Sequence, residues 1–339
     1  WVNEGTLHSV TNYQLHKALY SGHNDHNYFE IAHTVKNLYA KGGNRPDGLK
    51  LYNFVDNHDV ERIYTKLNVK AHFTPVHILL YTLPGIPSVY YGSEFGIEGK
   101  KDRFSDDSLR PALSFSECQN AAEQNPFTRL IAALGKVRKS AAPLSYGDYN
   151  ELLLTNRQYA FSRNYEGESV VVAVNNDDSD YVMTLPAGNA AEYIGALSGE
   201  RVSVTGGNIA VNIKANAGEI WLPVSGEHRA DQTPSGSVIP DTSDLIKAEA
   251  MPQSLAEPKA CAKPEPKEDA AAKEEPAAEK KENAKEAPDE SFEKGRIAGL
   301  QEAILAIMEK NGPVTEQMKR DVRNNVYHDS LITWIKSFR

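Results

Sequence analysis

The sequence is poor in cysteine, in basic charge and in long apolar runs. Only two cysteines occur among 339 residues, Cys118 and Cys261, which argues against a disulfide framework and against a thiolate metal site. Lys and Arg number 37 against 46 Asp and Glu, so the net charge of -9 offers no basic surface to a nucleic-acid backbone. The longest apolar run, residues 303–308, is far shorter than the roughly 18 residues of a membrane span. We therefore expect neither nucleic-acid binding nor a membrane-spanning helix.

The N-terminal residues show no signal-peptide pattern. The chain begins at Trp1 instead of Met and lacks the basic, apolar and small-residue sections of a signal peptide. We expect that processing or truncation has removed the true start. The N-terminus therefore gives no indication of a cellular location.

Composition divides the chain into four segments, 1–141, 142–226, 227–291 and 292–339. Within the third segment, residues 231–290 contain no aromatic residue, and 38 of these 60 are Ala, Glu, Lys or Pro. Such a stretch buries too little apolar surface to offset its ordering entropy, so we predict a disordered linker. The fourth segment has apolar residues at helical spacing and predicts a helical hairpin. This hairpin either docks on a protein partner, self-associates, or packs on its own chain.

The first two segments differ in the order of their predicted strands and helices. In the first, strand-like runs alternate with helix-length segments, which predicts a parallel α/β arrangement. The runs are residues 7–13, 49–55 and 86–91, and the helical segments are 28–38, 71–83 and 126–139. About three such units are too few to close a (β/α)8 barrel, so we expect the C-terminal portion of one. The second segment predicts an antiparallel β-sandwich with strands at 151–154, 159–163, 169–175, 181–185, 201–204, 208–213 and 218–222.

Polar residues follow one of the predicted barrel strands directly. The apolar residues 51–55 are followed by Asp56, Asn57, His58 and Asp59. Catalytic groups gather at the C-terminal ends of parallel strands, because the loops and the substrate meet at that rim. A second notable stretch, residues 83–96, is a strand framed by Pro and Gly on one side and an acidic, Gly-rich turn on the other.

These motifs carry a family resemblance. Residues 54–59 resemble the fourth motif region of the α-amylase superfamily of glycoside hydrolases, and residues 85–94 are similar to its strand-eight region. Residues 7–13 are similar to its sixth strand, and the predicted sandwich matches its usual C-terminal domain. The resemblance covers roughly residues 1–225, and two motifs in the correct order make it specific.

The resemblance implies a retaining mechanism on α-glucans or maltooligosaccharides, with two carboxylates about 5 Å apart. In the family, the nucleophile and the acid/base stand on strands four and five, which would precede Trp1. The resemblance therefore implies that this chain alone is inactive. Asp59 matches the third carboxylate, a transition-state stabiliser, and His58 matches a neighbour that binds the sugar. The Asn of the family's calcium site is also absent, so we expect no cofactor here, and any calcium would belong to the parent enzyme.

Asp106 and Arg110 are further candidates for substrate binding. Family members often place an Asp and an Arg in this region to clamp a glucose unit away from the cleavage point. Asp107 is an equal candidate for the acidic partner, and a surface ion pair is the competing interpretation. The His58–Asp59 pair could likewise be structural or belong to a metal-dependent phosphohydrolase, but the latter needs further His and Asp residues.

Other polar and aromatic residues favour structural roles. Tyr90 and Tyr91 are more typical of a barrel core, and Glu94 of a structural rim position. Residues 23–26, His-Asn-Asp-His, lack a third metal ligand at a useful spacing and favour a solvated loop. The competing hypothesis for the whole chain is a non-catalytic carbohydrate-binding or scaffold protein.

Overall fold

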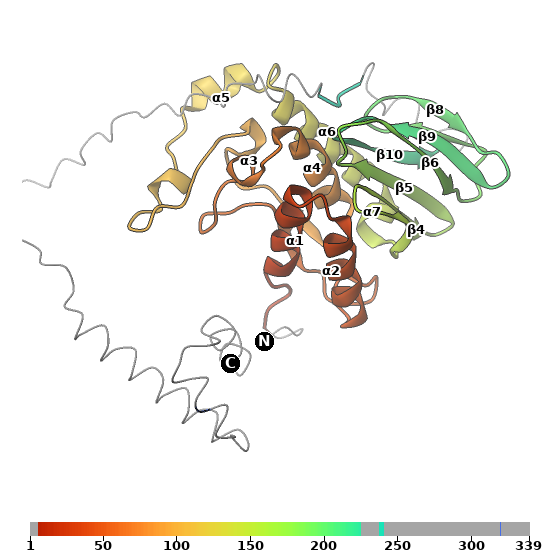
Figure 1. Cartoon of the computed structure of the whole chain (residues 1–339), viewed down its shortest axis with the longest axis horizontal. Helices are drawn as coiled ribbons and strands as arrows, with labels where there is room; N and C mark the ends of the chain where they lie inside the picture. Colours follow the sequence, from red (N-terminus) through yellow and green to blue (C-terminus); the bar gives the residue numbers. More distant parts are fainter. Residues whose placement is uncertain (1–5, 225–236, 241–318, 320–339) are drawn as a thin grey trace, which may run out of the picture. The chain divides into compact units, whose positions relative to one another are not determined.

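A computed structural model describes residues 6–224, 237–240 and 319. Residues 6–146, here called the barrel part, are mostly helical, and residues 147–224, the β domain, are all strand and turn (Figure 1). The helices of the barrel part are α1 (Tyr13–Asn24), α2 (Tyr28–Ala40), α3 (Ile63–Lys66), α4 (Phe73–Thr82), α5 (Phe115–Ala121), α6 (Pro126–Ser140) and α7 (Ala142–Tyr146). Its 3-10 turns are η1 (Lys70–His72), η2 (Ser93–Phe95) and η3 (Asp107–Leu109). The predicted helices near 28–38, 71–83 and 126–139 correspond to α2, α4 and α6.

Two short parallel strands form the sheet of the barrel part. β1 (Tyr52–Phe54) pairs with β2 (Ile86–Ser88), and Thr11 makes a parallel bridge to Tyr52. The parallel arrangement predicted from the sequence is thus observed, although each strand is shorter than its apolar run. Side chains tie the strands together, because Asn53 accepts a hydrogen bond from Asn12 (2.9 Å) and donates one to the Pro84 carbonyl (3.0 Å).

The predicted strand at residues 7–13 is present as isolated bridges rather than as a continuous strand, with Thr11 bridged to Tyr52, and a helix begins at its last residue. α1 begins at Tyr13, and the Asn12 side chain accepts a hydrogen bond from the Leu15 amide (3.1 Å). An Asn at this position satisfies an amide that has no partner within the helix, so it favours a helix start.

The β domain is antiparallel, as predicted. One sheet has the order β3-β4-β5-β10-β7-β8, and a second pairs β6 with β9. The strands are β3 (Asn150–Leu154), β4 (Gln158–Tyr165), β5 (Glu168–Asn175), β6 (Tyr181–Pro186), β7 (Glu192–Gly195), β8 (Arg201–Ser203), β9 (Asn208–Ile213) and β10 (Ala217–Pro223). A buried cluster that includes Met183, Ile209 and Trp221 lies between the two sheets. β7 is the strand that the sequence pattern missed.

The barrel part and the β domain share one hydrophobic core. This cluster joins α4 residues such as Ile78 and Leu79 to β-domain residues such as Phe161 and Ile220. The close approach requires a glycine, because a Cβ at Gly218 would lie 2.9 Å from the Ile78 Cδ1 and 2.8 Å from the Ala173 carbonyl oxygen. α4 therefore packs directly on β10.

Most of the predicted linker and all but one residue of the predicted hairpin lie outside the described residues. Four linker residues are described, 237–240, and the Val238 amide donates a hydrogen bond to the Leu197 carbonyl (2.8 Å). Val238 and Ile239 also pack against the shared core. No described helix has both the length and the apolar character needed to cross a membrane.

Candidate functional site

The loop after β1 presents His58 and Asp59 to solvent. Phe54, Val55 and Asp56 are buried, and the chain then emerges at the surface. The Asn57 side chain shapes this exit, because its Oδ1 accepts hydrogen bonds from the amides of Asp59 (2.8 Å) and Val60 (3.2 Å). A side chain that bonds to the amides two and three residues later makes a tight turn, so His58 and Asp59 stand at its outer edge.

The structure brings together the four residues singled out from the sequence. His58 Nε2 lies 3.3 Å from Asp59 Oδ2. The Arg110 guanidinium donates through Nε to the His58 carbonyl (3.1 Å) and through Nη2 to Asp59 Oδ1 (3.4 Å). The same Nη2 donates to Asp106 Oδ2 at 2.8 Å. We call His58, Asp59, Asp106 and Arg110 the polar cluster, and each of its side chains is roughly one third to one half exposed.

The choice between Asp106 and Asp107 is decided by geometry. Asp106 contacts Arg110, whereas Asp107 opens the 3-10 turn η3, and its amide donates to Ser105 Oγ (3.1 Å). Asp107 is exposed and takes part in none of the contacts of the polar cluster described above. The carboxylate that accompanies Arg110 in this structure is therefore that of Asp106.

Lys101 also reaches the polar cluster, and the sequence analysis did not single it out. Its Nζ donates to the Asp59 carbonyl at 2.8 Å and lies 3.7 Å from Asp106 Oδ1. The charged loop at residues 100–107 was the available signal, but nothing in the spacing indicated which lysine points inward. Two cations, Lys101 and Arg110, thus surround two carboxylates.

An aromatic pair borders the polar cluster. The Tyr90 and Tyr91 rings meet edge to face at 4.7 Å between centroids, and the Tyr90 ring lies 6.3 Å from that of His58. Tyr91 is 41% exposed, so the interpretation of this pair as barrel core does not hold for Tyr91. Glu94 lies in η2, where one carboxylate oxygen is buried and the backbone carbonyl accepts from Thr128 Oγ1 (2.8 Å). This placement agrees with a structural role for Glu94.

The histidines of residues 23–26 do not form a solvated loop. His23 is fully buried in α1, and its Nδ1 bonds to the Leu19 carbonyl (2.6 Å). Burial lowers the pKa of His23 to about 3, with neighbouring histidines adding to the effect. His26 contacts the Asn176 carbonyl (2.9 Å) of the β domain. The prediction was wrong because packing against a distant segment leaves no mark on the local sequence.

No group of three or more His, Cys, Asp or Glu side chains within the described residues is arranged to hold a metal ion.

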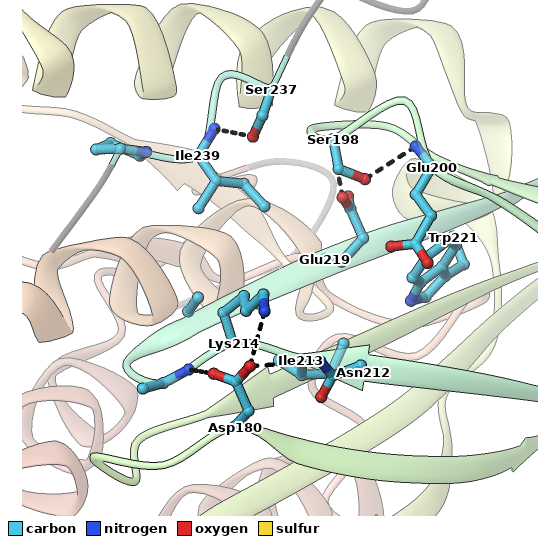
Figure 2. A pocket seen from close by; sticks show the side chains of 14 residues that line it. Asp180, Ser198, Glu200, Asn212, Ile213, Lys214, Glu219, Trp221, Ser237 and Ile239 are labelled. Atoms are coloured by element: carbon cyan, nitrogen blue, oxygen red, sulfur yellow. Dashed lines mark hydrogen bonds and ion pairs between the residues drawn. The ribbon is translucent and has the colours of Figure 1, made fainter.

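The β domain contains a separate cavity of about 520 Å³ (Figure 2). It is lined by residues of strands and turns and by the segment 237–240, and no member of the polar cluster contributes to it. Two of its carboxylates are already paired: Asp180 with Lys214 at 2.8 Å, and Glu219 with the amides of Leu197 (2.9 Å) and Ser198 (2.8 Å). Since these carboxylates are satisfied internally, the polar cluster is the better candidate for chemistry.

Two family models match the chain in succession. Residues 1–142 match the α-amylase catalytic domain, and residues 147–221 match the α-amylase C-terminal domain. Among curated proteins, a cyclomaltodextrinase from Thermoanaerobacter pseudethanolicus is 32% identical over 136 residues, 40% of this chain and 22% of that protein. A cyclomaltodextrin glucanotransferase from Bacillus licheniformis is 28% identical over 182 residues, 51% of this chain and 24% of that protein. The chain thus spans less than a quarter of the length of these two curated relatives.

Solved structures share the fold. An α-amylase from Anoxybacillus superposes with a TM-score of 0.54 at 22% identity, covering 65% of this chain and 48% of that one. A cyclomaltodextrin glucanotransferase with a three-domain ABC distribution gives 0.55 at 22% identity, covering 64% and 44%. The order of the two matched models is also the order of the barrel part and the β domain described above. The chain belongs to the α-amylase superfamily of glycoside hydrolases.

Proposed function

We propose that this chain provides the substrate-positioning and charge-stabilising side of an active site that cleaves α-glucans or maltooligosaccharides with retention of configuration. The observation that carries the proposal is the convergence of His58, Asp59 and Arg110 at the end of a parallel strand. The resemblance assigns Asp59 to the third carboxylate of such sites. The names of the relatives, a cyclomaltodextrinase and a cyclomaltodextrin glucanotransferase, support an α-glucan substrate.

The role proposed for Asp59 follows from the charge that develops during the reaction. Retaining glycosidases pass through an oxocarbenium-like transition state, in which positive charge builds up at the anomeric carbon. A carboxylate that accepts hydrogen bonds from ring hydroxyls interacts more strongly as that charge grows, so it lowers the barrier more than it tightens ground-state binding. Arg110 holds Asp59 Oδ1, which fixes the orientation of the carboxylate before substrate arrives.

The neighbouring groups suit the binding of sugar hydroxyls. His58 stands beside Asp59 and offers ring nitrogens, while Arg110 and Asp106 supply a donor and an acceptor on the other side of the polar cluster. The resemblance assigns neither the nucleophile nor the acid/base to any residue of this chain. We therefore propose that the 339 residues alone give no turnover and that the complete parent enzyme is needed for hydrolysis.

The test is Asp59→Asn in the parent enzyme, with maltoheptaose as substrate. We expect kcat to fall about a thousandfold, equivalent to roughly 4 kcal/mol of transition-state stabilisation, with a smaller change in KM. The melting temperature should be nearly unchanged, because Asn is almost isosteric and the side chain is 48% exposed. Asp107→Asn is the matched control and should keep kcat within about twofold, as expected for a surface position.

Three results would contradict the proposal. A near-normal kcat for Asp59→Asn, with the fold intact, would remove Asp59 from the active site. A parent protein that binds maltoheptaose but never hydrolyses or transfers it would favour the carbohydrate-binding or scaffold hypothesis. Measurable turnover by the purified 339-residue chain would refute the assignment of the nucleophile and acid/base to other residues.

A further inference from the structure

Arg62 lies directly beneath the polar cluster and is completely buried. It precedes α3, and its guanidinium reaches two other segments of the chain. Nη1 donates to the Tyr91 carbonyl (2.7 Å) and to Ser93 Oγ (3.1 Å), both in the turn after β2. Nη2 donates to the Leu109 carbonyl (2.8 Å), immediately before Arg110. One side chain therefore connects the loop after β1, the turn after β2 and the segment that carries Arg110.

The hydrogen bonds of the buried Arg62 guanidinium described above go to two backbone carbonyls and one hydroxyl, and none of them goes directly to a carboxylate. Ser93 Oγ, which accepts from Arg62, donates to Asp56 Oδ1 at 2.6 Å, and Asp56 Oδ2 accepts from the Ile63 amide at 2.8 Å. Burial raises the pKa of Asp56, and the bonds from Ser93 and Ile63 and the Arg62 charge act in the opposite direction. The result is a buried relay from Arg62 through Ser93 to Asp56 that spans the ends of β1 and β2.

Two aromatic rings flank the guanidinium. Its Cζ lies 4.4 Å from the centroid of the Tyr90 ring and 5.2 Å from that of Tyr91. A desolvated cation over an aromatic face is attracted by the ring quadrupole. Since Tyr90 in turn faces His58, the position of Arg62 also sets the aromatic border of the polar cluster.

The backbone is built closely around this side chain. The Arg62 amide donates to the Gly99 carbonyl at 3.0 Å. A Cβ at Gly99 would lie 2.9 Å from the Arg62 Cγ and 2.5 Å from the Ser108 carbonyl oxygen, so only glycine fits there. The same strip of chain continues to Lys101, whose Nζ holds the Asp59 carbonyl.

We propose that Arg62 is a positioning residue of the sugar site: it contacts no substrate, but its fork of donors holds the segments that carry Asp59, Tyr90 and Arg110 together. The inference rests on the function proposed above. A guanidinium is required because its planar fork serves acceptors in several directions at once, whereas an ammonium is a single point of donation. Loss of the fork would let the Arg110 segment shift relative to Asp59.

The test compares Arg62→Lys with Arg163→Lys in the parent enzyme. Arg163 is a matched control, because it is equally buried and also donates to backbone carbonyls, those of Thr82, Gly147 and Asp148, but it lies in β4 away from the polar cluster. Both variants should melt at lower temperature. Well below those melting points, Arg62→Lys should lower kcat on maltoheptaose about a hundredfold, as expected for a displacement near 1 Å, and Arg163→Lys should stay within about twofold. Equal kcat for the two variants would overturn the proposal.

Hydrogen exchange in the 339-residue chain gives a readout that needs no turnover. The amides of Leu109 and Arg110, bonded to Asp106 and Asp107, should exchange faster in Arg62→Lys than in Arg163→Lys. Unchanged exchange there would overturn the positioning role. If the wild-type parent enzyme shows no activity on α-glucans, the proposed function fails, and the exchange result still decides whether Arg62 holds this segment.

A second variant covers the case in which Arg62→Lys does not fold. Ser93→Ala breaks the relay to Asp56 but leaves the Arg62 bonds to the carbonyls of Tyr91 and Leu109. We expect a loss of about tenfold in kcat, in line with a partial loss of orientation, with KM less affected. A normal kcat in a folded Ser93→Ala enzyme would contradict the role of the relay.

Discussion

The barrel part and the β domain differ in how many large apolar side chains they expose to solvent. In the β domain, the large apolar residues that are strongly exposed are Tyr181 and Val182, both in β6. In the barrel part, they are Leu7, Val10, Tyr13, Phe29, Tyr52, Ile86, Tyr91, Phe104, Phe115 and Tyr146. Tyr52 and Ile86 belong to the two-stranded sheet itself. The candidate site thus lies in the part that exposes more large apolar side chains, whereas the β domain packs around its own second core.

Both parts bury apolar side chains, and α4 and β10 share one core. In the barrel part, buried polar side chains, including Asn53, Asp56 and Arg62, also hold loops that have little apolar cover. We therefore expect substitutions in the second core to affect mainly stability, and substitutions that loosen these loops to affect mainly the site.

The largest expected loss of stability comes from the β-domain core. Ile209 lies in β9, is fully buried between the two sheets and belongs to the second core. Ile209→Ala should lower the free energy of unfolding by about 2–5 kcal/mol, because it removes buried methyl groups and leaves a cavity. Urea unfolding of the 339-residue chain measures this change. A loss below about 1 kcal/mol would show that this core is not well packed.

A smaller loss of stability is expected when the pH falls and the buried histidines between the two parts are protonated. Burial lowers the pKa of His72 and of His77 to about 4, against an ordinary value of 6.5. Because the folded state disfavours the protonated form, the stability they contribute is complete above pH 6.5 and is lost as the pH falls towards 4. In this range, each group lowers the free energy of unfolding by up to about 1.4 kcal/mol for each unit that the pH falls.

The variant His77→Leu isolates one of these groups. Among the described residues the Nε2 of His77 has no partner, so His77→Leu removes a titrating group at the cost of one bond, that of Nδ1 to the Phe73 carbonyl (2.8 Å). Urea unfolding between pH 7 and 4 should show a shallower decline than in the unchanged chain, by about one proton's slope. The matched control is His33→Gln, because His33 is exposed on α2. A decline for His77→Leu as steep as that of the unchanged chain would contradict the prediction.

The smallest effect is expected at Ile86, which forms a matched pair with Ile209. Ile86 is 46% exposed at the start of β2. Ile86→Ala should change the free energy of unfolding of this chain by no more than about 0.5 kcal/mol, as for other exposed positions. The same urea titration applies. A cost comparable with that of Ile209→Ala would mean that the sheet of the barrel part is covered in solution, and the contrast between the two parts would disappear.

Much of the fold could be predicted because local patterns persist through folding. α2, α4 and α6 follow apolar spacing, and seven of the eight strands of the β domain follow short runs separated by turns. β7 was missed because its four residues carry little periodicity. α1 (Tyr13–Asn24) begins where the predicted strand at residues 7–13 ends, and it was not among the predicted helical segments.

The sequence by itself determined the motif at residues 54–59, the second motif at 85–94 and their order, and these identify the family. Only the tertiary structure decided that Asp106 rather than Asp107 accompanies Arg110, that Lys101 reaches Asp59, and that Arg62 joins the loops beneath them. The reason is physical. A motif records which groups follow one strand, whereas these contacts join residues 42 to 51 positions apart or depend on which way a turn such as η3 points. Loop packing sets those distances, and it leaves no periodic signal in the chain.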